Sequence, residues 1–245
     1  MKLRVVTWNV WFGEWNAARR QEALWAELAR LEPDVICLQE MTQEHLDRPE
    51  LHARRFGGEW ISDAYINGYD VIALARVPVR RSERLPLASV MGRNLLVTRL
   101  DIDPPLTIAT VHLESTKRMT EFRVRQLGDI NSFLAAEPDV LLVGDMNFAD
   151  DAPAETAAIE GWRDAWRELR PDEPGYTLDS ERNTMRGWTK PGEKRARLDR
   201  ALLRSDRWRV TSIERLGTEP LPEDPLTFIS DHFGLLIELE PRPRA

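Results

Sequence analysis

The fold is decided by residues 106–147, LTIATVHLESTKRMTEFRVRQLGDINSFLAAEPDVLLVGDMN. This stretch opens with the strand-like run Leu106–Leu113 and closes with the strand-like run Val140–Val143, and both are apolar almost throughout. Between them, Thr120 is a candidate N-cap for a helix over Glu121–Ala136. Because continuous apolar strands are buried on both faces, we expect these two strands to lie inside the molecule with the helix outside.

Similar patterns recur along the rest of the chain. The further strand-like runs are Leu3–Val10, Asp34–Gln39, Val71–Ala75, Leu95–Leu100, Leu198–Leu203 and Leu235–Leu239. Asn16 is a candidate N-cap for a second helix, which Pro33 ends. The strands over Leu95–Leu113 follow one another without a helix, which requires an antiparallel pair. We therefore predict an α/β fold in which two mixed sheets pack face to face with helices outside.

The length and punctuation of the chain indicate one domain. No linker-like tract, repeat or low-complexity segment divides the 245 residues, so we predict a single catalytic domain over residues 1–245, with a frayed tail at 241–245. The first residues lack the features of a secretory signal, and no apolar stretch is long enough to cross a bilayer. The lone cysteine, Cys37, excludes an intramolecular disulfide. We expect a soluble intracellular protein and predict a cytoplasmic location without a membrane partner.

Charge is unevenly spread. The formal net charge of −7 weighs against a protein coated for nucleic-acid binding. The stretch Arg186–Arg209 is nevertheless basic, with Arg186, Lys190, Lys194, Arg195, Arg197, Arg200, Arg204, Arg207 and Arg209. A second basic run consists of Arg76, Arg80, Arg81 and Arg84. Each run fits either a nucleic-acid surface or a set of solvated strand and loop faces.

Polar residues with useful chemistry follow several strand-like runs. Glu40 stands where a buried strand emerges, and Asp231 precedes the last strand. Mg²⁺ prefers oxygen ligands and needs only one or two carboxylates beside a substrate phosphate. We therefore predict Glu40 and Asp231 as metal ligands, with Mn²⁺ as an alternative ion. The competing interpretation of Glu40 is a helix-start carboxylate, favoured by the dipole of a helix beginning near Met41.

The motif Gly144-Asp145-Met146-Asn147 follows another buried strand. Glycine lets the backbone approach closely, and Asp145 can accept a proton from an attacking water. Asn147 can hydrogen-bond that water or a phosphate oxygen, and Asn9 ends a strand in the same way. The structural alternative is an Asx turn that caps a helix near Ala152.

Two of the four histidines stand beside strands. An imidazolium at His232 can stabilise charge on phosphorus if a carboxylate holds the ring, and Asp199 is the best candidate for that carboxylate. His112, with Ser115 close behind it, can donate to a phosphate oxygen, although a satisfied core histidine is an alternative. The other two, His45 and His52, lie on a polar helical stretch and are expected at the surface.

Other enzyme classes lack necessary parts. The sequence has no glycine-rich phosphate loop with a trailing Lys-Ser/Thr, no nucleophile elbow of the G-x-S-x-G kind, and no Cys or His cluster suited to zinc. Metal-assisted attack by water remains. The alternatives left open are a catalytically inactive binding module and an active phosphoesterase.

Six ordered motifs resemble those of the endonuclease/exonuclease/phosphatase superfamily, over nearly the whole chain. The motifs are Thr7-Trp8-Asn9, Leu38-Gln39-Glu40, His112-Leu113-Glu114-Ser115, Gly144-Asp145-Met146-Asn147, Leu198-Asp199-Arg200 and Ser230-Asp231-His232. The resemblance implies a four-layered α/β sandwich with the site at one end of the sheets. It also implies that Asn9, Asp145 and Asn147 surround the nucleophilic water and phosphate, that Glu40 binds Mg²⁺ with Asp231, and that an Asp199–His232 pair lies opposite them.

Within the superfamily the chain is most similar to the 5′-tyrosyl-DNA phosphodiesterases of the tyrosyl-DNA phosphodiesterase 2 type. The similarity lies in His112-Leu113-Glu114-Ser115-Thr116 with Arg123 and Gln126, in Gly68-Tyr69, Asp164-Ala165-Trp166 and Tyr176-Thr177, and in the ending Ser230–Leu235. The chain departs from that branch where Leu178 and Leu198 replace aromatic residues and Ala149 replaces a basic one. Trp11 stands where many members carry an acidic residue. The Trp11 departure weakens the inference of a second metal-linked carboxylate. The departures at Leu178, Leu198 and Ala149 weaken the expected grip on single-stranded DNA, since stacking contributes about 1–3 kcal/mol per base.

The resemblance leads to a specific hypothesis. It implies Mg²⁺-dependent hydrolysis of the bond between a protein tyrosine and a DNA 5′ phosphate, a DNA-repair reaction that leaves a 5′-phosphate end. The implied partner is DNA with a 5′-tyrosyl or otherwise blocked 5′ end, with no obligate protein partner evident. The residues expected to bind the substrate are Tyr69, Ser115, Arg123 and Met185, with the basic stretch Arg186–Arg209 along the strand path. The alternative is a generalist nuclease or a small-phosphoester phosphatase of the same superfamily.

Overall fold

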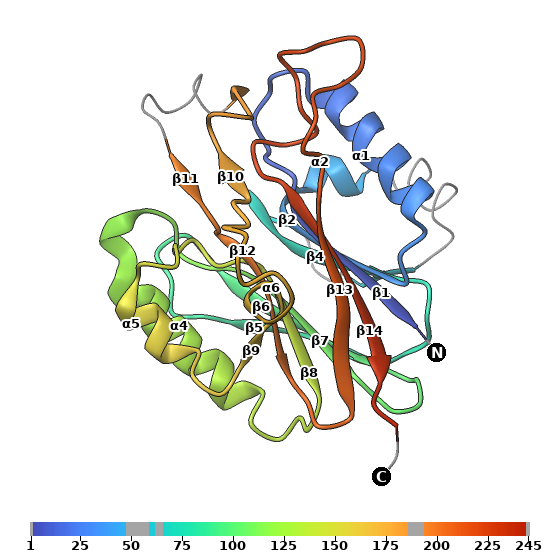
Figure 1. The fold of residues 1–245 in the computed structure, drawn as a ribbon, viewed down its shortest axis with the longest axis vertical. Coiled ribbons are helices and arrows are strands. Elements are labelled where there is room, and N and C mark those ends of the chain that lie inside the picture. The colour runs from blue at the N-terminus through green and yellow to red at the C-terminus, as the bar shows by residue number, and fades with distance from the viewer. Residues whose placement is uncertain (1, 48–58, 62–65, 186–193, 244–245) are drawn as a thin grey trace.

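The protein is represented by a computed structural model, which describes residues 2–47, 59–61, 66–185 and 194–243. Within these residues, two six-stranded sheets pack face to face (Figure 1). The first sheet contains β13 (Trp208–Leu216), β14 (Gly234–Pro241), β1 (Leu3–Asn9), β2 (Val35–Thr42), β4 (Tyr69–Ala75) and β3 (Glu59–Ile61), in that spatial order. The second contains β5 (Val79–Pro86), β6 (Asn94–Leu100), β7 (Thr107–His112), β8 (Val140–Asp145), β12 (Asp199–Arg204) and β9 (Arg163–Asp164). Both sheets are mixed, as the sequence predicts: β1 is parallel to β2, and β7 is parallel to β8.

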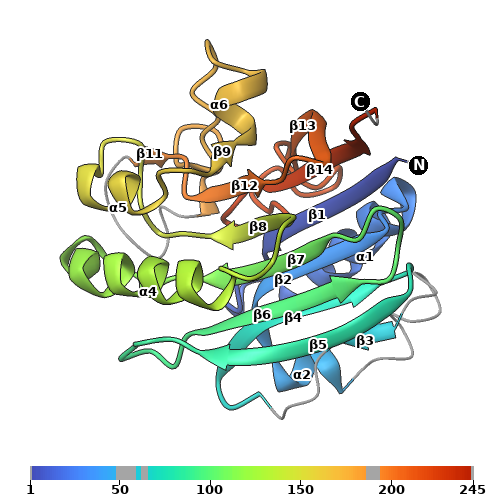
Figure 2. The same cartoon turned by 90° about the horizontal axis from the view of Figure 1, so that it is seen from below.

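Helices cover the outer faces of the two sheets (Figure 2). Helix α1 (Ala17–Leu31) buries Leu24 and Leu28 against the first sheet. Helices α4 (Thr120–Phe133) and α5 (Pro153–Ala158) cover the second sheet. The smaller elements are α2 (Gln43–Leu46), the 3₁₀ helix η1 (Lys117–Met119), α6 (Ala165–Leu169) and a hairpin of β10 (Leu178–Asp179) and β11 (Arg195–Ala196). The predicted sandwich with helices outside is confirmed.

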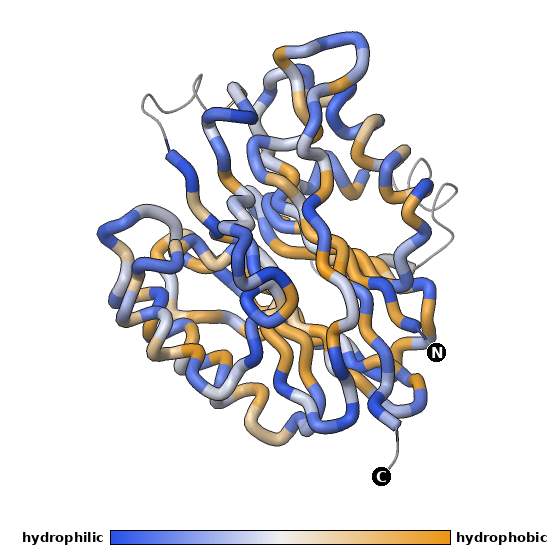
Figure 3. The backbone as a smooth tube through the Cα atoms, viewed as in Figure 1, coloured by the Kyte–Doolittle hydropathy of each residue, from blue (hydrophilic) through white to orange (hydrophobic). Residues whose placement is uncertain are grey.

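The main core lies between the sheets. Its buried side chains come from strands of both, and they include Val5, Val35, Ile237, Leu96, Ile108, Leu141 and Leu203. Figure 3 shows orange, apolar stretches along the strands of both sheets, interrupted by polar residues, while blue predominates in many connections. Full burial of one such aliphatic side chain contributes roughly 1.5–3 kcal/mol. This core fixes the spacing of the two sheets and therefore of the residues at their ends.

The predicted N-cap position is confirmed at Asn16 and wrong at Thr120. Asn16 stands at the N-cap position of α1, but its φ is 45° and its side chain makes no capping hydrogen bond. Its Nδ2 instead donates to Thr227 Oγ1 at 2.9 Å, which ties the start of α1 to a distant loop. Thr120 is the first residue of α4, and Met119 occupies the cap position. Tertiary hydrogen bonding outweighs local capping at the start of α1.

The first and last strands are neighbours in the middle of the first sheet. Strands β1 and β14 are antiparallel, with Leu3 opposite Leu239 and Thr7 opposite Leu235. The start of β1 and the end of β14 therefore lie at the same end of the strands, and Figure 1 shows N and C on the same side. Asn9 and the start of β14 lie at the opposite end of these strands. Within the described ranges, no helix combines the length and apolar character that crossing a bilayer requires.

Candidate active site

Three predicted site residues form a row across adjacent strands of the second sheet. In the register of β7, β8 and β12, His112 pairs with Asp145, and Asp145 pairs with Asp199. Residues directly opposite each other on neighbouring strands project from the same face of a sheet. All three side chains are buried, and they point toward the first sheet. The strand pairing itself thus brings together residues that are up to 87 positions apart in the sequence.

His232 completes a pair with Asp199. Its Nδ1 lies 2.8 Å from Asp199 Oδ2 and 4.0 Å from Asp145 Oδ2. The segment that carries His232 is fixed by a hydrogen bond from Ser230 Oγ to the Asn9 carbonyl (2.6 Å) and by one from Trp8 Nε1 to the His232 carbonyl (3.0 Å). Burial by itself lowers the pKa of His232, but the carboxylates of Asp199 and Asp145 outweigh burial and raise that pKa to about 10. The pair is therefore an imidazolium held by a carboxylate at neutral pH.

Asp145 lies at the centre of the site. Its Oδ2 accepts a hydrogen bond from Asn9 Nδ2 at 3.0 Å, and its Oδ1 accepts one from the Asn147 backbone N–H at 2.9 Å. Burial opposes ionisation of Asp145, but the charge of His232 and these hydrogen bonds hold its pKa below the ordinary value. Asp145 is thus an ionised carboxylate and a potential proton acceptor. The bond to Asn147 is an Asx turn, but it does not cap α5, whose N-cap residue is Ala152.

His112 is neutral and has a defined tautomer. Burial lowers its pKa to about 3, although Asp145 opposes this shift. Its Nδ1 lies 3.1 Å from Nη1 of Arg93, and because arginine can only donate, Nδ1 accepts this hydrogen bond. The ring proton therefore resides on Nε2, which lies 3.4 Å from Asp145 Oδ2. His112 thus lies in contact with Asp145 and Arg93, and its burial and hydrogen bond also fit the alternative of a satisfied core histidine.

Arg93 is a site residue that the sequence reasoning missed. It is buried, and its Nη2 donates to Ser115 Oγ at 2.9 Å. Asn147 Nδ2 donates to the Leu113 carbonyl at 3.0 Å and approaches the same Ser115 hydroxyl at 3.4 Å. The available signal was its place just before β6, because the start of β6 lies beside the end of β7 in an antiparallel pair. A residue there necessarily lies near His112.

Glu40 joins the site from the first sheet. It lies inside β2 at a bulge between Leu38 and Met41, with φ of 62°, so the helix-start interpretation is wrong. Asn9 Nδ2, which donates to Asp145, also donates to Glu40 Oε1 at 3.1 Å. Burial raises the pKa of Glu40 to about 7, and the nearby negative charge of Asp231 adds to this shift. One amide thus connects the candidate metal carboxylate with the candidate base.

Glu40 and Asp231 fit a hard divalent cation. They place two negative charges close enough to raise the pKa of Glu40, and both offer oxygen ligands. Arg20 is the nearby cation, but within the described part of the chain its side chain donates five hydrogen bonds that all go to backbone carbonyls. A second group, Asp145, Asp199 and His232, has ligand atoms within 4.8 Å of one another. That group suits Mg²⁺ less well, because His232 is protonated and already bonded to Asp199.

The predicted substrate residues divide into two groups. Tyr69 and Ser115 lie at the site: the Tyr69 ring centroid is 6.1 Å from that of His112, and Ser115 is bonded to Arg93. Arg123 does not face a substrate, because it is buried and pairs with Glu155 at 2.8 Å. Met185 is fully buried, and its sulfur accepts from the backbone N–H of Phe228. The predictions for Arg123 and Met185 are wrong, since both side chains hold the loops beside the site.

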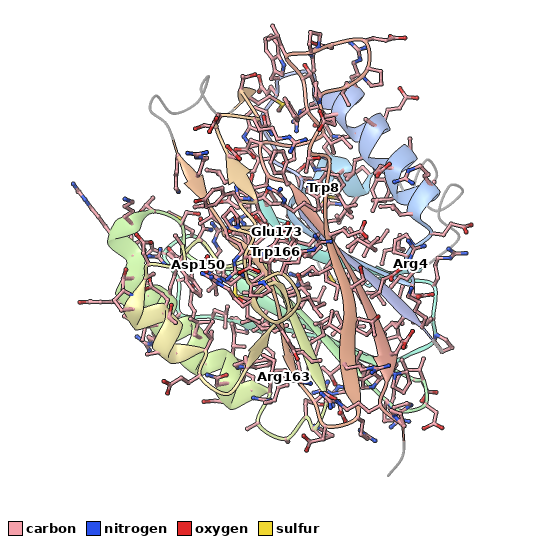
Figure 4. The ribbon with its side chains drawn as sticks, in the orientation of Figure 1. Arg4, Trp8, Asp150, Arg163, Trp166 and Glu173 are labelled. Carbon is pink, nitrogen blue, oxygen red and sulfur yellow. The ribbon has the colours of Figure 1, made fainter. Side chains whose placement is uncertain are left out.

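The basic stretch is largely occupied by internal pairing. Arg197 and Arg200 are buried and share Asp150, which Figure 4 labels, and Asp164, at distances of 2.6–3.1 Å. The other pairs are Arg195 with Glu181, Arg204 with the Leu134 carbonyl, Arg207 with Asp139 and Arg209 with Glu240. The prediction that this stretch lines a strand path is therefore wrong at Arg197 and Arg200. Arg186, Lys190 and His52, for which the sequence analysis makes predictions, lie outside the described residues.

Comparisons with known proteins agree with this geometry. The model of the endonuclease/exonuclease/phosphatase family matches residues 6–232. Tyrosyl-DNA phosphodiesterase 2 of Danio rerio is 31% identical over 249 residues, which cover 96% of this chain and 66% of that protein. The Xenopus laevis enzyme of the same name is also 31% identical, with the same coverage. The chain thus spans just under two thirds of the length of these curated relatives.

Solved structures share the fold. The structure of D. rerio TDP2 complexed with single strand DNA product has a TM-score of 0.87 and 27% identity, and the match covers 98% of this chain and 99% of that one. The human Nocturnin catalytic domain with bound sulfate has a TM-score of 0.74 at 18% identity, covering 98% and 95%, a likeness of fold alone. The family match extends over nearly the entire sequence and includes all the candidate site residues described above, from Asn9 to His232. The chain belongs to the endonuclease/exonuclease/phosphatase family.

Proposed function

We propose that the chain is a Mg²⁺-dependent phosphodiesterase that hydrolyses the bond between a protein tyrosine and a DNA 5′ phosphate, leaving a 5′-phosphate end. The observation that carries the proposal is the Asn9 amide, which donates to Glu40 at 3.1 Å and to Asp145 at 3.0 Å. This bridge holds the candidate metal ligand and the candidate base a fixed distance apart. The relatives named tyrosyl-DNA phosphodiesterase 2 support the substrate class. The predicted partner, DNA with a 5′-tyrosyl or other blocked 5′ end, belongs to the same proposal.

Asp145 and its neighbours supply the proton chemistry. The ionised Asp145 accepts a proton from water, and Asn147 orients the water or a phosphate oxygen. The His232 imidazolium, held by Asp199, and the Nε2–H of His112 face the charge that develops on phosphorus. Mg²⁺ bound by Glu40 and Asp231 would neutralise charge on the phosphoryl oxygens. A phenolate leaves readily because its pKa, about 10, is far below that of an alkoxide.

Asp145→Asn tests the catalytic assignment. The amide keeps the shape of the side chain and loses the proton acceptor, so we expect kcat to fall roughly 100- to 10,000-fold. Asp172→Asn, in an exposed turn, is the matched control and should keep wild-type activity. Equal background turnover by the wild type and Asp145→Asn, with no activity attributable to the site, would instead support an inactive binding module with this fold.

A substrate panel tests the specificity. The panel compares a 5′-tyrosyl oligonucleotide, an abasic duplex, a plain single strand and inositol phosphates, each with Mg²⁺ and with a chelator. The proposal requires Mg²⁺-dependent release of 5′-phosphate DNA from the tyrosyl substrate. Turnover of another panel member without the tyrosyl reaction would contradict it. The cytoplasmic location stays part of this proposal, and cell fractionation tests it.

One observation favours a generalist nuclease or small-phosphoester phosphatase instead. Leu178, Ala196 and Leu198 form a small buried apolar cluster, with Ala149 packed against it. Three of these positions are those where the sequence departs from the tyrosyl-DNA branch. This cluster offers no aromatic ring to a DNA strand. The same substrate panel separates the two functions.

A further inference from the structure

An exposed aromatic ring stands beside the candidate metal carboxylate. The Phe12 ring is stacked on the Tyr69 ring with centroids 4.6 Å apart and planes inclined by 29°. Phe12 is nevertheless 46% exposed, because Tyr69 covers only part of its surface. Its backbone N–H approaches Glu40 Oε2 at 3.3 Å. The ring therefore offers a free face next to the place where a phosphate would bind.

The stack is anchored in the site rather than loosely exposed. The guanidinium carbon of Arg93 lies 5.0 Å from the Tyr69 ring centroid, and the same arginine holds His112 and Ser115. Stacking of two aromatic rings in this geometry adds to the stabilisation that their burial provides. Tyr69 is thus in contact with both Phe12 and Arg93, and Phe12 is the outermost ring of the series.

The loop that carries Phe12 is also held in place. Arg20 is buried, and it donates to the carbonyls of Val10, Trp11 and Gly13, which surround Phe12 on both sides in the sequence. Its guanidinium carbon lies 4.5 Å from the Trp11 ring centroid. A platform fixed before the ligand arrives loses little conformational entropy on binding.

We infer that the free face of Phe12 stacks against a nucleobase of the DNA strand, at the nucleotide whose 5′ phosphate is attacked. The inference rests on the proposed function. A phenol ring is one oxygen atom from phosphorus, whereas a base is separated from its 5′ phosphorus by the sugar. Phe12 lies one ring further from His112 than Tyr69 does, which suits the longer reach of the base. Phe12 thereby supplies an aromatic contact that Leu178 and Leu198, both buried, cannot provide.

The test compares two substrates that differ only in the first base. One is a 5′-tyrosyl single strand, and the other carries a tetrahydrofuran abasic analogue at its first nucleotide. For the wild type, removal of the base should lower kcat/KM by about 5- to 100-fold. The ratio of kcat/KM for the substrate with the base to kcat/KM for the abasic substrate should approach one in Phe12→Ala and Phe12→Leu. Phe12→Trp should keep the wild-type ratio. Phe133→Ala, an exposed aromatic on α4, is the matched control and should keep the wild-type ratio.

A binding measurement separates this inference from the proposed function. Fluorescence anisotropy gives the Kd for a 5′-phosphorylated strand with and without its first base, and the same pattern of ratios is expected without any turnover. If the wild type fails to hydrolyse the tyrosyl substrate, the proposed function fails while the Kd ratios still decide the role of Phe12. Loss of kcat/KM on both substrates by the same factor, or a wild-type ratio in Phe12→Ala, would overturn the inference.

Discussion

Glu40 is a half-buried carboxylate whose ionisation opposes folding when no cation is bound. Its pKa of about 7 in the folded chain lies above the ordinary value, so the ionised form is disfavoured there. The destabilisation is complete above pH 7 and disappears as the pH falls toward 4.5, where glutamate is protonated in the unfolded chain as well. We expect Glu40→Gln to raise the free energy of unfolding at pH 8 by on the order of 1–3 kcal/mol.

Chemical denaturation with chelator at pH 8 and pH 5 measures this effect. The increase in the free energy of unfolding of Glu40→Gln over the wild type should be present at pH 8 and small at pH 5. Added Mg²⁺ should stabilise the wild type and leave Glu40→Gln unchanged, because ligand binding stabilises only the state that binds. A variant that is less stable than the wild type at pH 8 would contradict the assignment.

At the scale of residues, the sequence indicates which polar residues stand beside strands, but it does not indicate which other side chains each of them contacts. The prediction of Asp199 beside His232 is confirmed by the 2.8 Å contact, since each stands in a short motif at or just before the start of a strand. The predictions at Arg123 and Met185 failed because the residue type alone does not indicate whether an arginine or methionine side chain points into the protein or toward the substrate. Arg93 was missed because its role depends on β6 lying beside β7. The pairing of β6 with β7 belongs to the tertiary structure and cannot be seen in the local sequence around Arg93.

At the scale of elements, Gly144 determines how closely β8 approaches β7. Its φ is 134°, and a Cβ there would lie against the Val111 carbonyl oxygen, well inside van der Waals contact. We expect Gly144→Ala to lower the free energy of unfolding by about 2–4 kcal/mol and to displace Asp145. Gly128, inside α4, has nothing within 4 Å of its would-be Cβ, so Gly128→Ala should instead add about 0.5–1 kcal/mol. Thermal denaturation of both variants is the measurement, and similar losses in both would contradict this account.

Helix α2 depends on a histidine that must stay neutral. His45, predicted at the surface, is half-buried, and its Nδ1 accepts a hydrogen bond from the Thr42 backbone N–H at 2.9 Å. Burial lowers the pKa of His45, so its protonation favours the unfolded chain. The wild type should therefore lose stability as the pH falls below about 6.5.

His45→Gln isolates this effect, because glutamine keeps a capping acceptor without titrating. We expect the difference in free energy of unfolding between wild type and variant to change by roughly 0.5–1 kcal/mol between pH 8 and pH 5. Denaturant titrations at both pH values measure it. A difference that stays constant across this range would exclude His45 as the titrating group.

The predicted and missed strands differ in pattern. Every strand predicted from an apolar run is present, because strands in the middle of a sandwich are buried on both faces. Strands β5 and β13 were missed, and both lie at the edge of a sheet. Their sequences, VRRSERLP and WRVTSIERL, carry charges on the exposed face. Charged edge strands prevent unwanted pairing but hide the strand signal from a search for apolar runs.

At the scale of the whole molecule, Arg20 connects distant segments on which the site depends. Besides the loop after β1, it donates to the Ile229 carbonyl at 3.3 Å, just before Ser230 and Asp231. Burial lowers its pKa to about 10 although Asp231 and Glu40 oppose this shift, so it stays charged at neutral pH. We expect Arg20→Met to lower the free energy of unfolding by roughly 3–5 kcal/mol, since several carbonyls lose their donor.

Arg30→Met on the same helix is the matched control. Arg30 is exposed and pairs with Glu27 at 2.7 Å, a contact that contributes at most about 0.5 kcal/mol. Denaturation gives the two stabilities, and calorimetric titration with Mg²⁺ gives the metal affinities. Arg20→Met should also bind the metal more weakly, because the segments of both candidate ligands lose an anchor. Equal stability and affinity in the two variants would contradict a positioning role for Arg20.

The sandwich was predictable because its two sheets follow from apolar runs and connection lengths. The position of the site was predictable only through the ordered motifs, since Asn9 and Glu40 come from one sheet and His112, Asp145 and Asp199 from the other. No local sequence pattern indicates how the two sheets are placed relative to each other. The single domain over residues 1–245 stays a prediction, which one coincident unfolding transition by two probes would support.

The pairing of β1 with β14 has a practical consequence for handling the protein. Leu3 and Leu239 are paired at the end of the first sheet that lies away from Asn9 and the candidate active site. An affinity tag, a fluorescent fusion or a surface tether attached on that side therefore leaves the candidate site accessible to DNA. The same arrangement suits circular permutation, since a short peptide can join the old ends and new ones can be opened in a remote turn.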